Sequence, residues 1–217
     1  MKTDAQLKKD VEAELEWDPS INATRVGVAV QDGVVTLTGH LGTFAEKFAA
    51  ERAAKRVAGV RGVAVELDVA LAPHHRISDA EIAAAVQNAF KWHALIPEDR
   101  IHFTVEQGWV TLTGMVDWEH QRHNAEIAVR PLTGVLGVVN KIHLRPRDVL
   151  DHVAHRIRDA LERYVEDEAK QVEVLVNGGT ATLRGTVNSW AEREVVQHAA
   201  WSAAGIQRVV NELKVAS

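Results

Sequence analysis

Apolar residues recur at every fourth position in three stretches of the chain, with polar residues between them. The first stretch has Leu7, Val11 and Leu15, and two later stretches repeat this spacing. A stripe at i, i+4 and i+8 lies on one face of a helix, so the pattern predicts three amphipathic helices. Two of them begin with the spacing of a capping box. The later stripes are Ile82, Val86, Phe90 and Val153, Ile157, Leu161; the capping boxes are Thr3-x-x-Gln6 and Ser78-x-x-Glu81, and Asp148 is the expected cap of the third helix.

After each of these helices, apolar and polar residues alternate, and this period of two predicts half-buried strands. In the first case the alternation runs over residues 26–30 and resumes at 35–37, after Asp32-Gly33. Glycine at that place supplies a positive φ, so the two strands are expected to form a hairpin. A second helix with Ala50 and Ala53 on its buried stripe follows, and a last strand is expected over residues 63–69.

The hairpin segment Gly33-Val34-Val35-Thr36-Leu37-Thr38-Gly39 recurs twice, at offsets of 75 and then 71 residues. The same offsets align the other predicted elements, so the chain consists of three homologous units. Each is expected to be an α+β unit in the order helix, strand, strand, helix, strand (αββαβ), with a small mixed sheet and both helices on one sheet face. The expected units are residues 1–72, 73–145 and 146–217, with linkers near Pro73 and Pro146.

The combined pattern resembles the BON domain, named for bacterial osmotically induced and nodulation proteins. The resemblance is carried by Gly-x-Val-x-Leu-x-Gly at the hairpin, by the alanine-rich helix, and by a tail that starts at Gly134-Val135 in the second unit and contains Asn140. The first unit has Val65 where the family has Asn. The hydrogen bond that we expect this Asn to make to a neighbouring loop is therefore absent from that unit or replaced. The third unit departs from the hairpin motif at Ala181 and Arg184.

The resemblance implies a non-enzymatic binding module with a role in osmotic or envelope stress and without a cofactor. It implies association with phospholipid membrane surfaces or with an envelope protein partner. The alternative that it implies is binding of potassium (K+), which would make the chain a cytoplasmic cation sensor. Acidic connections at Glu98-Asp99 and Glu166-Asp167-Glu168 supply oxygens that suit a hard cation, although solvated acidic loops explain them equally simply.

Composition and charge argue against several other classes of protein. The chain has 217 residues, 46% of them hydrophobic, no cysteine and a formal net charge of −5, which excludes disulfides and thiolate chemistry. The expected units carry net charges of −2, −1 and −2, which argues against a nucleic-acid-binding face on any of them. No apolar run approaches the ~18–20 residues of a transmembrane helix. The first residues lack the apolar core of a secretory signal, so we expect a cytoplasmic protein; a trimmed periplasmic form is the alternative.

Candidate catalytic and metal sites are few. The sequence contains no Gly-x-Ser-x-Gly elbow and no phosphate loop, so we expect no catalytic residues. His120 and His123, and likewise His152 and His155, have i, i+3 spacing on predicted helices. Neither pair recurs in the other units, and a metal ion would need further ligands from elsewhere. We therefore expect these histidines to lie on solvated faces and not to form a metal site.

Tryptophan is the most informative residue type, with six in the chain. Trp17 and Trp92 occupy matched positions near the end of the first helix of their units, two residues beyond the apolar stripe. Local packing and contact with lipid or a protein partner are both open interpretations, because an indole ring suits either. Trp109 is out of phase with Val110 and Leu112, so it is expected to project from the uncovered sheet face and to contact a neighbouring unit.

We expect the units to pack against one another, since a unit of about 70 residues buries only ~60% of its unfolded surface. The predicted contact surfaces are the uncovered sheet face or a helix flank. The shorter second linker favours the second and third units as the more rigid pair.

Overall fold

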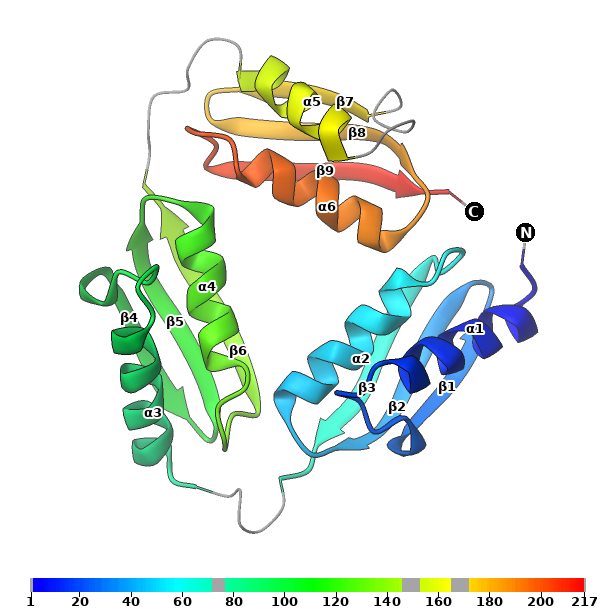
Figure 1. Ribbon diagram of the computed structural model, residues 1–217, viewed down its shortest axis with the longest axis horizontal. Coiled ribbons are helices and arrows are strands. Elements are labelled where there is room, and N and C mark those ends of the chain that lie inside the picture. Colours follow the sequence, from blue (N-terminus) through cyan, green and yellow to red (C-terminus); the bar gives the residue numbers. More distant parts are fainter. Residues whose placement is uncertain (1, 72–76, 146–152, 165–171, 217) are drawn as a thin grey trace.

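A computed structural model describes residues 2–71, 77–145, 153–164 and 172–216 and shows three α+β units arranged as a triangle (Figure 1). Each unit has two helices and three strands, in the order that the repeat predicts. The linkers around Pro73 and Pro146, the expected cap Asp148, His152 and the acidic connection 166–168 lie outside the described residues.

The elements of the three units correspond one to one. The first unit comprises α1 (Asp4–Trp17), the short turn η1 (Ala23–Arg25), β1 (Val26–Gln31), β2 (Val34–Leu41), α2 (Phe44–Arg56) and β3 (Gly62–Val69). The second comprises α3 (Asp79–Trp92), η3 (Glu98–Arg100), β4 (Ile101–Glu106), β5 (Trp109–Val116), α4 (Glu119–Val129) and β6 (Gly137–Leu144). The third comprises α5 (Val153–Tyr164), β7 (Val172–Asn177), β8 (Thr180–Val187), α6 (Trp190–Trp201) and β9 (Arg208–Val215).

Each unit forms its own three-stranded mixed sheet. The first two strands form an antiparallel hairpin, and the third strand runs parallel to the second. A parallel strand needs a crossover connection, which the second helix of the unit supplies. The matched pairs that open this parallel ladder are Val34–Gly62, Trp109–Gly137 and Thr180–Arg208. The predicted fold class, three tandem α+β units with small mixed sheets, is confirmed.

Every unit has a separate apolar core between its sheet and its two helices. In the first unit Leu7, Val11 and Leu15 are at most 2% exposed, as their spacing predicts. Ala50 and Ala53 on α2 are fully buried, because the small side chain lets this helix lie close to the sheet. Burial of one large apolar side chain stabilises the fold by about 1.5–3 kcal/mol, so these stripes determine where the helices pack.

The hairpin turn of the first unit is fastened to the start of its first helix. Asp32 and Gly33 have φ angles of 52° and 77°, and positive φ at both central residues is the requirement of a type I′ turn. Their N–H groups donate to the carboxylate of Asp4 at 2.8 and 3.0 Å. Asp79 accepts the corresponding hydrogen bonds in the second unit at 2.8 and 2.9 Å. The hairpin and the helix start therefore form one rigid piece.

The last glycine of the hairpin motif is required by a close approach between the paired strands. Gly39 has a φ of 133°, and a Cβ atom there would lie 2.0 Å from the carbonyl oxygen of Arg25. At the matched Gly114 the corresponding distance to the carbonyl oxygen of Arg100 is 2.2 Å. Any larger residue would push the two strands apart, so this glycine is part of the strand pairing.

The Asn of the family tail ties the last strand to the second helix. The Nδ2 group of Asn140 donates to the carbonyl oxygen of Arg122 at 3.1 Å and to Oε2 of Glu126 at 3.0 Å. Its Oδ1 accepts from the N–H of Ile142 at 3.1 Å. The expectation that this Asn bonds to a neighbouring loop is therefore wrong, because its partners lie on α4 and on its own strand. Val65, at the matched position of the first unit, packs against the apolar core instead.

The three units meet through their second helices, and α2, α4 and α6 border the centre of the triangle (Figure 1). At least one contact crosses each boundary between units. Arg130 lies 3.6 Å from the ring centroid of Phe48, Arg122 lies 4.4 Å from that of Trp201, and Lys55 Nζ lies 4.0 Å from Glu194 Oε1. Since every pair of units is in contact, the units close into a ring, and the second and third units are not set apart as a pair.

Two of the second helices also insert their first residue against a neighbouring core. Phe44 opens α2 and packs against the core of the second unit, and Trp190 opens α6 and packs against the core of the first. At the matched position of α4, Glu119 pairs with Arg122 at 2.8 Å. The contacts between units therefore run along a helix flank, one of the two surfaces predicted from the sequence.

Replacing Asn140 by Val, the residue type at position 65, should lower the free energy of unfolding by about 1–3 kcal/mol, because the N–H of Ile142 loses its acceptor and α4 loses two hydrogen bonds. Urea unfolding of the full chain measures this loss. Thr104→Val on β4, at an exposed position, is the control and should change the value by about 0.5 kcal/mol or less. Equal losses in the two variants would contradict the role given to Asn140.

Trp190→Ala should lower the melting temperature of the full chain by about 4 °C or more, because its ring packs at the boundary between the third and first units. Differential scanning calorimetry gives this shift. Trp17→Ala removes a ring that is 84% exposed and should shift the melting temperature by about 1 °C or less. If both variants melted at the same temperature, Trp190 would not stabilise the ring.

Candidate functional site

Trp17 and Trp92 end α1 and α3 and are the most exposed large apolar side chains of the described residues, at 84% and 86%. Leu15 and Phe90, two residues earlier, are 1% and 3% exposed. The two-residue offset from the apolar stripe thus turns each indole ring away from the core. Both rings are in solvent. Local packing, one of the two interpretations of the sequence, is therefore not what the structure shows.

The surroundings of these two rings hold no cluster of basic residues, although Lys91 directly precedes Trp92. Helix α1 carries five carboxylates and two lysines, and its last turn has no basic residue. Asp18 follows Trp17, and hydrogen bonds from Ser20, with the nearby Arg56 guanidinium, hold the pKa of that carboxyl below its usual value. Near Trp92, Leu95 is 55% exposed and enlarges the apolar surface. A ligand at these helix ends would therefore meet apolar rings and not an excess of positive charge.

Trp109 begins β5 and is 50% exposed, while Val110 beside it is fully buried on the opposite sheet face. Its ring covers Gly137 on the neighbouring strand: a Cβ atom at that glycine would lie 2.3 Å from the ring. Trp109 thus projects from the uncovered face, as its phase predicts, and packs on its own unit. The contact with another unit that we expected of it stays a prediction.

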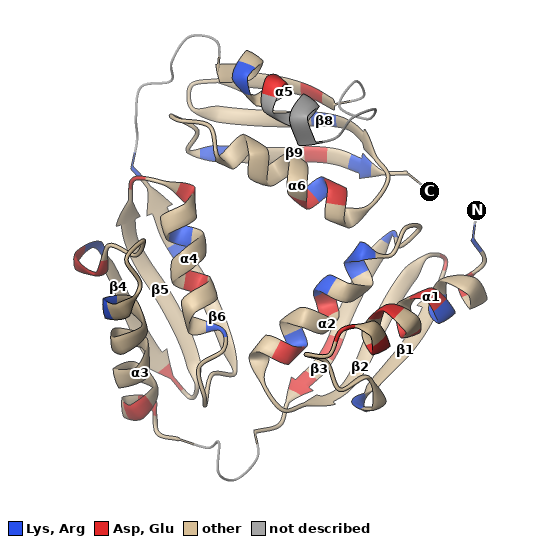
Figure 2. Ribbon diagram, viewed as in Figure 1, with Lys and Arg blue, Asp and Glu red and all other residues tan. Residues whose placement is uncertain are grey.

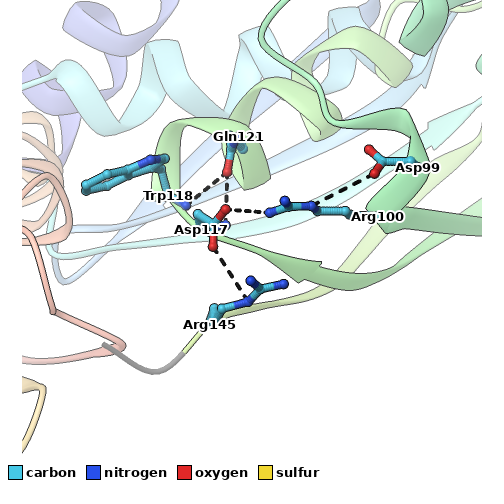
Figure 3. A network of polar contacts seen from close by, with 6 residues as sticks. All are labelled: Asp99, Arg100, Asp117, Trp118, Gln121 and Arg145. Atoms are coloured by element: carbon cyan, nitrogen blue, oxygen red, sulfur yellow. Dashed lines mark hydrogen bonds and ion pairs between the residues drawn. The ribbon is translucent and has the colours of Figure 1, made fainter. Parts of the chain in front are cut away.

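A polar network holds the turn between β5 and α4 (Figure 3). Asp117 accepts a hydrogen bond from Arg100, and its other oxygen lies 3.6 Å from Nε of Arg145. The N–H groups of Asp117 and Trp118 both donate to Oε1 of Gln121 at 3.0 Å. Arg100 ends η3 directly before β4, and Arg145 lies just after β6, so the network connects both outer strands to the start of α4. It thereby orients the helix that faces the other units.

His123 on α4 faces His198 on α6, with ring centroids 5.9 Å apart. Burial lowers the pKa of the His123 imidazole, and the neighbouring His198 and Arg130 lower it further. Burial also raises the pKa of Glu119, which begins the same helix. Shifts toward the neutral form in a base and in an acid indicate that this boundary is partly withdrawn from water. The sequence did not predict this pair, because the two histidines meet only when the ring closes.

Two other side chains that the sequence singled out, His120 and Asp99, have local partners. His120 stacks on Trp118 with centroids 6.5 Å apart, and Asp99 of the first acidic connection lies 4.0 Å from Arg100. Among the residues that the structure describes, no group of three or more His, Asp and Glu side chains could hold a metal ion. In the same part of the chain, no helix combines the length and apolar character needed to cross a bilayer.

Several known proteins are similar to this chain. Osmotically-inducible protein Y of Escherichia coli (strain K12) is 27% identical over 146 residues, which cover 64% of this chain and 73% of that protein. Two solved structures of CdsD, a structural protein of the type III secretion system of Chlamydia trachomatis, match at 17% and 16% identity. They cover 100% and 96% of this chain and 100% and 91% of their own, with TM-scores of 0.26 and 0.24. At such TM-scores nothing follows from them for this chain.

The family assignment rests on matches that together cover nearly the whole chain. The pattern of the BON domain family matches it three times, over residues 3–70, 78–146 and 150–217. These matches coincide with the three αββαβ units of the structure. The chain therefore belongs to the BON domain family and contains three tandem BON domains.

Proposed function

We propose that this chain is a non-enzymatic binding protein of the osmotic stress response, which attaches to phospholipid membrane surfaces through Trp17 and Trp92. The observation that carries the proposal is the 84% and 86% exposure of these rings at matched helix ends. Membership of the BON domain family and similarity to an osmotically inducible protein support the stress-related role.

An indole ring suits the boundary between lipid headgroups and acyl chains, because its apolar body enters the acyl region while its N–H stays hydrated. Burial of apolar surface contributes roughly 25 cal/mol per Å². Within the folded chain Trp17 and Trp92 are both over four-fifths exposed, so most of this burial energy is not realised. Insertion into a membrane surface would recover it, and the rigid ring of units would hold the two indoles at fixed positions during binding.

The charge of the chain favours attachment by ring burial over attraction to anionic lipid. The formal net charge is −5, and α1 itself has more carboxylates than lysines. Electrostatic recruitment to anionic membranes uses clusters of Lys and Arg, which these helix ends lack. Binding should therefore be as strong on zwitterionic as on anionic vesicles, and it should depend little on salt.

Potassium binding and a protein partner in place of lipid both stay predictions. At the first acidic connection, Asp99 lies 4.0 Å from Arg100, which already offers this carboxylate a positive partner. The second acidic connection, residues 166–168, lies outside the described part of the chain.

The affinity of the double variant Trp17→Ala/Trp92→Ala for vesicles should be lower than that of wild type by about tenfold or more, because the variant loses both apolar rings. Co-sedimentation with phosphatidylcholine vesicles, and with vesicles that also contain phosphatidylglycerol, measures the bound fraction. The two single variants show whether each ring reaches the membrane.

Trp109→Ala is the matched control, since it removes another exposed indole, at 50%, from a different surface. It should bind as wild type does. Absence of binding by wild type on both vesicle types, or an equal loss in the control, would refute attachment through Trp17 and Trp92.

A further inference from the structure

A cavity of about 1260 Å³ lies between the three units, where their second helices meet. Its wall is rich in arginine. The arginines are Arg52 and Arg56 of α2, Arg122 of α4, Arg130 just beyond α4 and Arg156 of α5; the carboxylates are Glu119 and Glu194. Three of these arginines are paired with carboxylates: Arg56 with Glu14, Arg122 with Glu119 and Arg130 with Glu126. The positive charge left without a carboxylate partner among the described residues of the wall is that of Arg52 and Arg156. Figure 2 shows Lys and Arg on α2 and α4, which border the centre.

Several of these arginines have donors to spare. Arg56 is held by Glu14 at 2.8 Å, but Arg52 and Arg156 are exposed and have no carboxylate partner among the described residues. The Nε group of Arg130 is buried and has no hydrogen-bond partner in the described structure, although a terminal nitrogen of this guanidinium donates to Glu126. Buried donors are almost always satisfied, so this Nε–H calls for an acceptor, which an ordered water or an anion in the cavity can supply.

Aromatic rings hold two of the guanidinium groups in place. Arg130 stacks on Phe48 at 3.6 Å from the ring centroid, and Arg122 stacks on Trp201 at 4.4 Å. A stacked guanidinium keeps the N–H groups at its edge available to the oxygens of an anion. Ile127, which is 45% exposed, adds apolar surface to the same wall. The cavity thus combines positioned cationic donors with apolar and aromatic surface.

We infer that this cavity binds a small anionic ligand that has a phosphate group and an apolar body. The planar donor pairs of arginine match the oxygens of phosphate, and Phe48 and Ile127 offer contact to the apolar part. His123 and His198 on the wall add ring nitrogens that can donate or accept. The site is distinct from the proposed membrane contact, because it uses neither Trp17 nor Trp92.

Isothermal titration calorimetry of the full chain in low-salt buffer tests the site with two probes. Inorganic pyrophosphate represents a free phosphate compound, and monomeric dihexanoylphosphatidylglycerol represents a lipid headgroup with short chains. The lipid probe should bind wild type, and Arg52→Gln/Arg156→Gln should weaken that binding by about tenfold or more. Both residues are exposed, and the melting temperature of the variant checks that the fold is kept.

Arg25→Gln/Arg208→Gln is the matched control, because it removes the same charge from exposed positions of the same two units, away from the cavity wall. Its affinity should stay within about twofold of wild type at fixed ionic strength. Binding of the lipid alone, or of the lipid more tightly than pyrophosphate, supports a ligand with a phosphate group and an apolar body. Binding of pyrophosphate alone identifies a free phosphate compound and would overturn the apolar part of the inference. Absence of binding by both probes, or an equal loss in the two double variants, would overturn the inference. The Trp17→Ala/Trp92→Ala variant should bind as wild type does.

Discussion

The second helix of each unit packs against two partners at once, and the arrangement of the whole chain depends on this double contact. In the first unit Ala50 and Ala53 lie fully buried against the sheet, while Phe44 and Phe48 of the same helix reach the second unit. A unit of about 70 residues buries only ~60% of its unfolded surface, so the outer flank supplies burial that a single unit lacks. Closure of the ring then forms the cavity between the units and fixes the positions of the exposed helix ends.

The three boundaries use equivalent positions with different chemistry. Positions 48, 123 and 194 are matched by the repeat and carry Phe, His and Glu, while the matched positions 55, 130 and 201 carry Lys, Arg and Trp. The resulting contacts are a cation–π pair at Phe48–Arg130, an ion pair at Glu194–Lys55, and a boundary where His123 meets His198 and Trp201 lies under Arg122. Because each boundary pairs different residue types, the same units in another order would not make these contacts.

The fold could be predicted because the buried apolar residues recur at matched positions in each unit. Leu15 and Phe90 are buried where their stripes require it. The same helical spacing placed Trp17 and Trp92 off the stripe but did not decide between local packing and exposure. The ring could not be predicted, since its contact positions share no residue type that a repeat would reveal. The cavity could not be predicted for a related reason. Each unit is acidic when its charges are summed along the chain. Arg52, Arg130 and Arg156 lie on one wall only after the three units have packed.

Closure of the ring is tested most directly by the distance between the first and third units, which are far apart in sequence. The chain has no cysteine, so Ala13→Cys on α1 and Lys214→Cys on β9, both exposed, would carry the only two spin labels. Pulsed dipolar spectroscopy of the full chain should give one narrow distance distribution. A broad distribution, as expected for units joined only by their linkers, would contradict the closed ring.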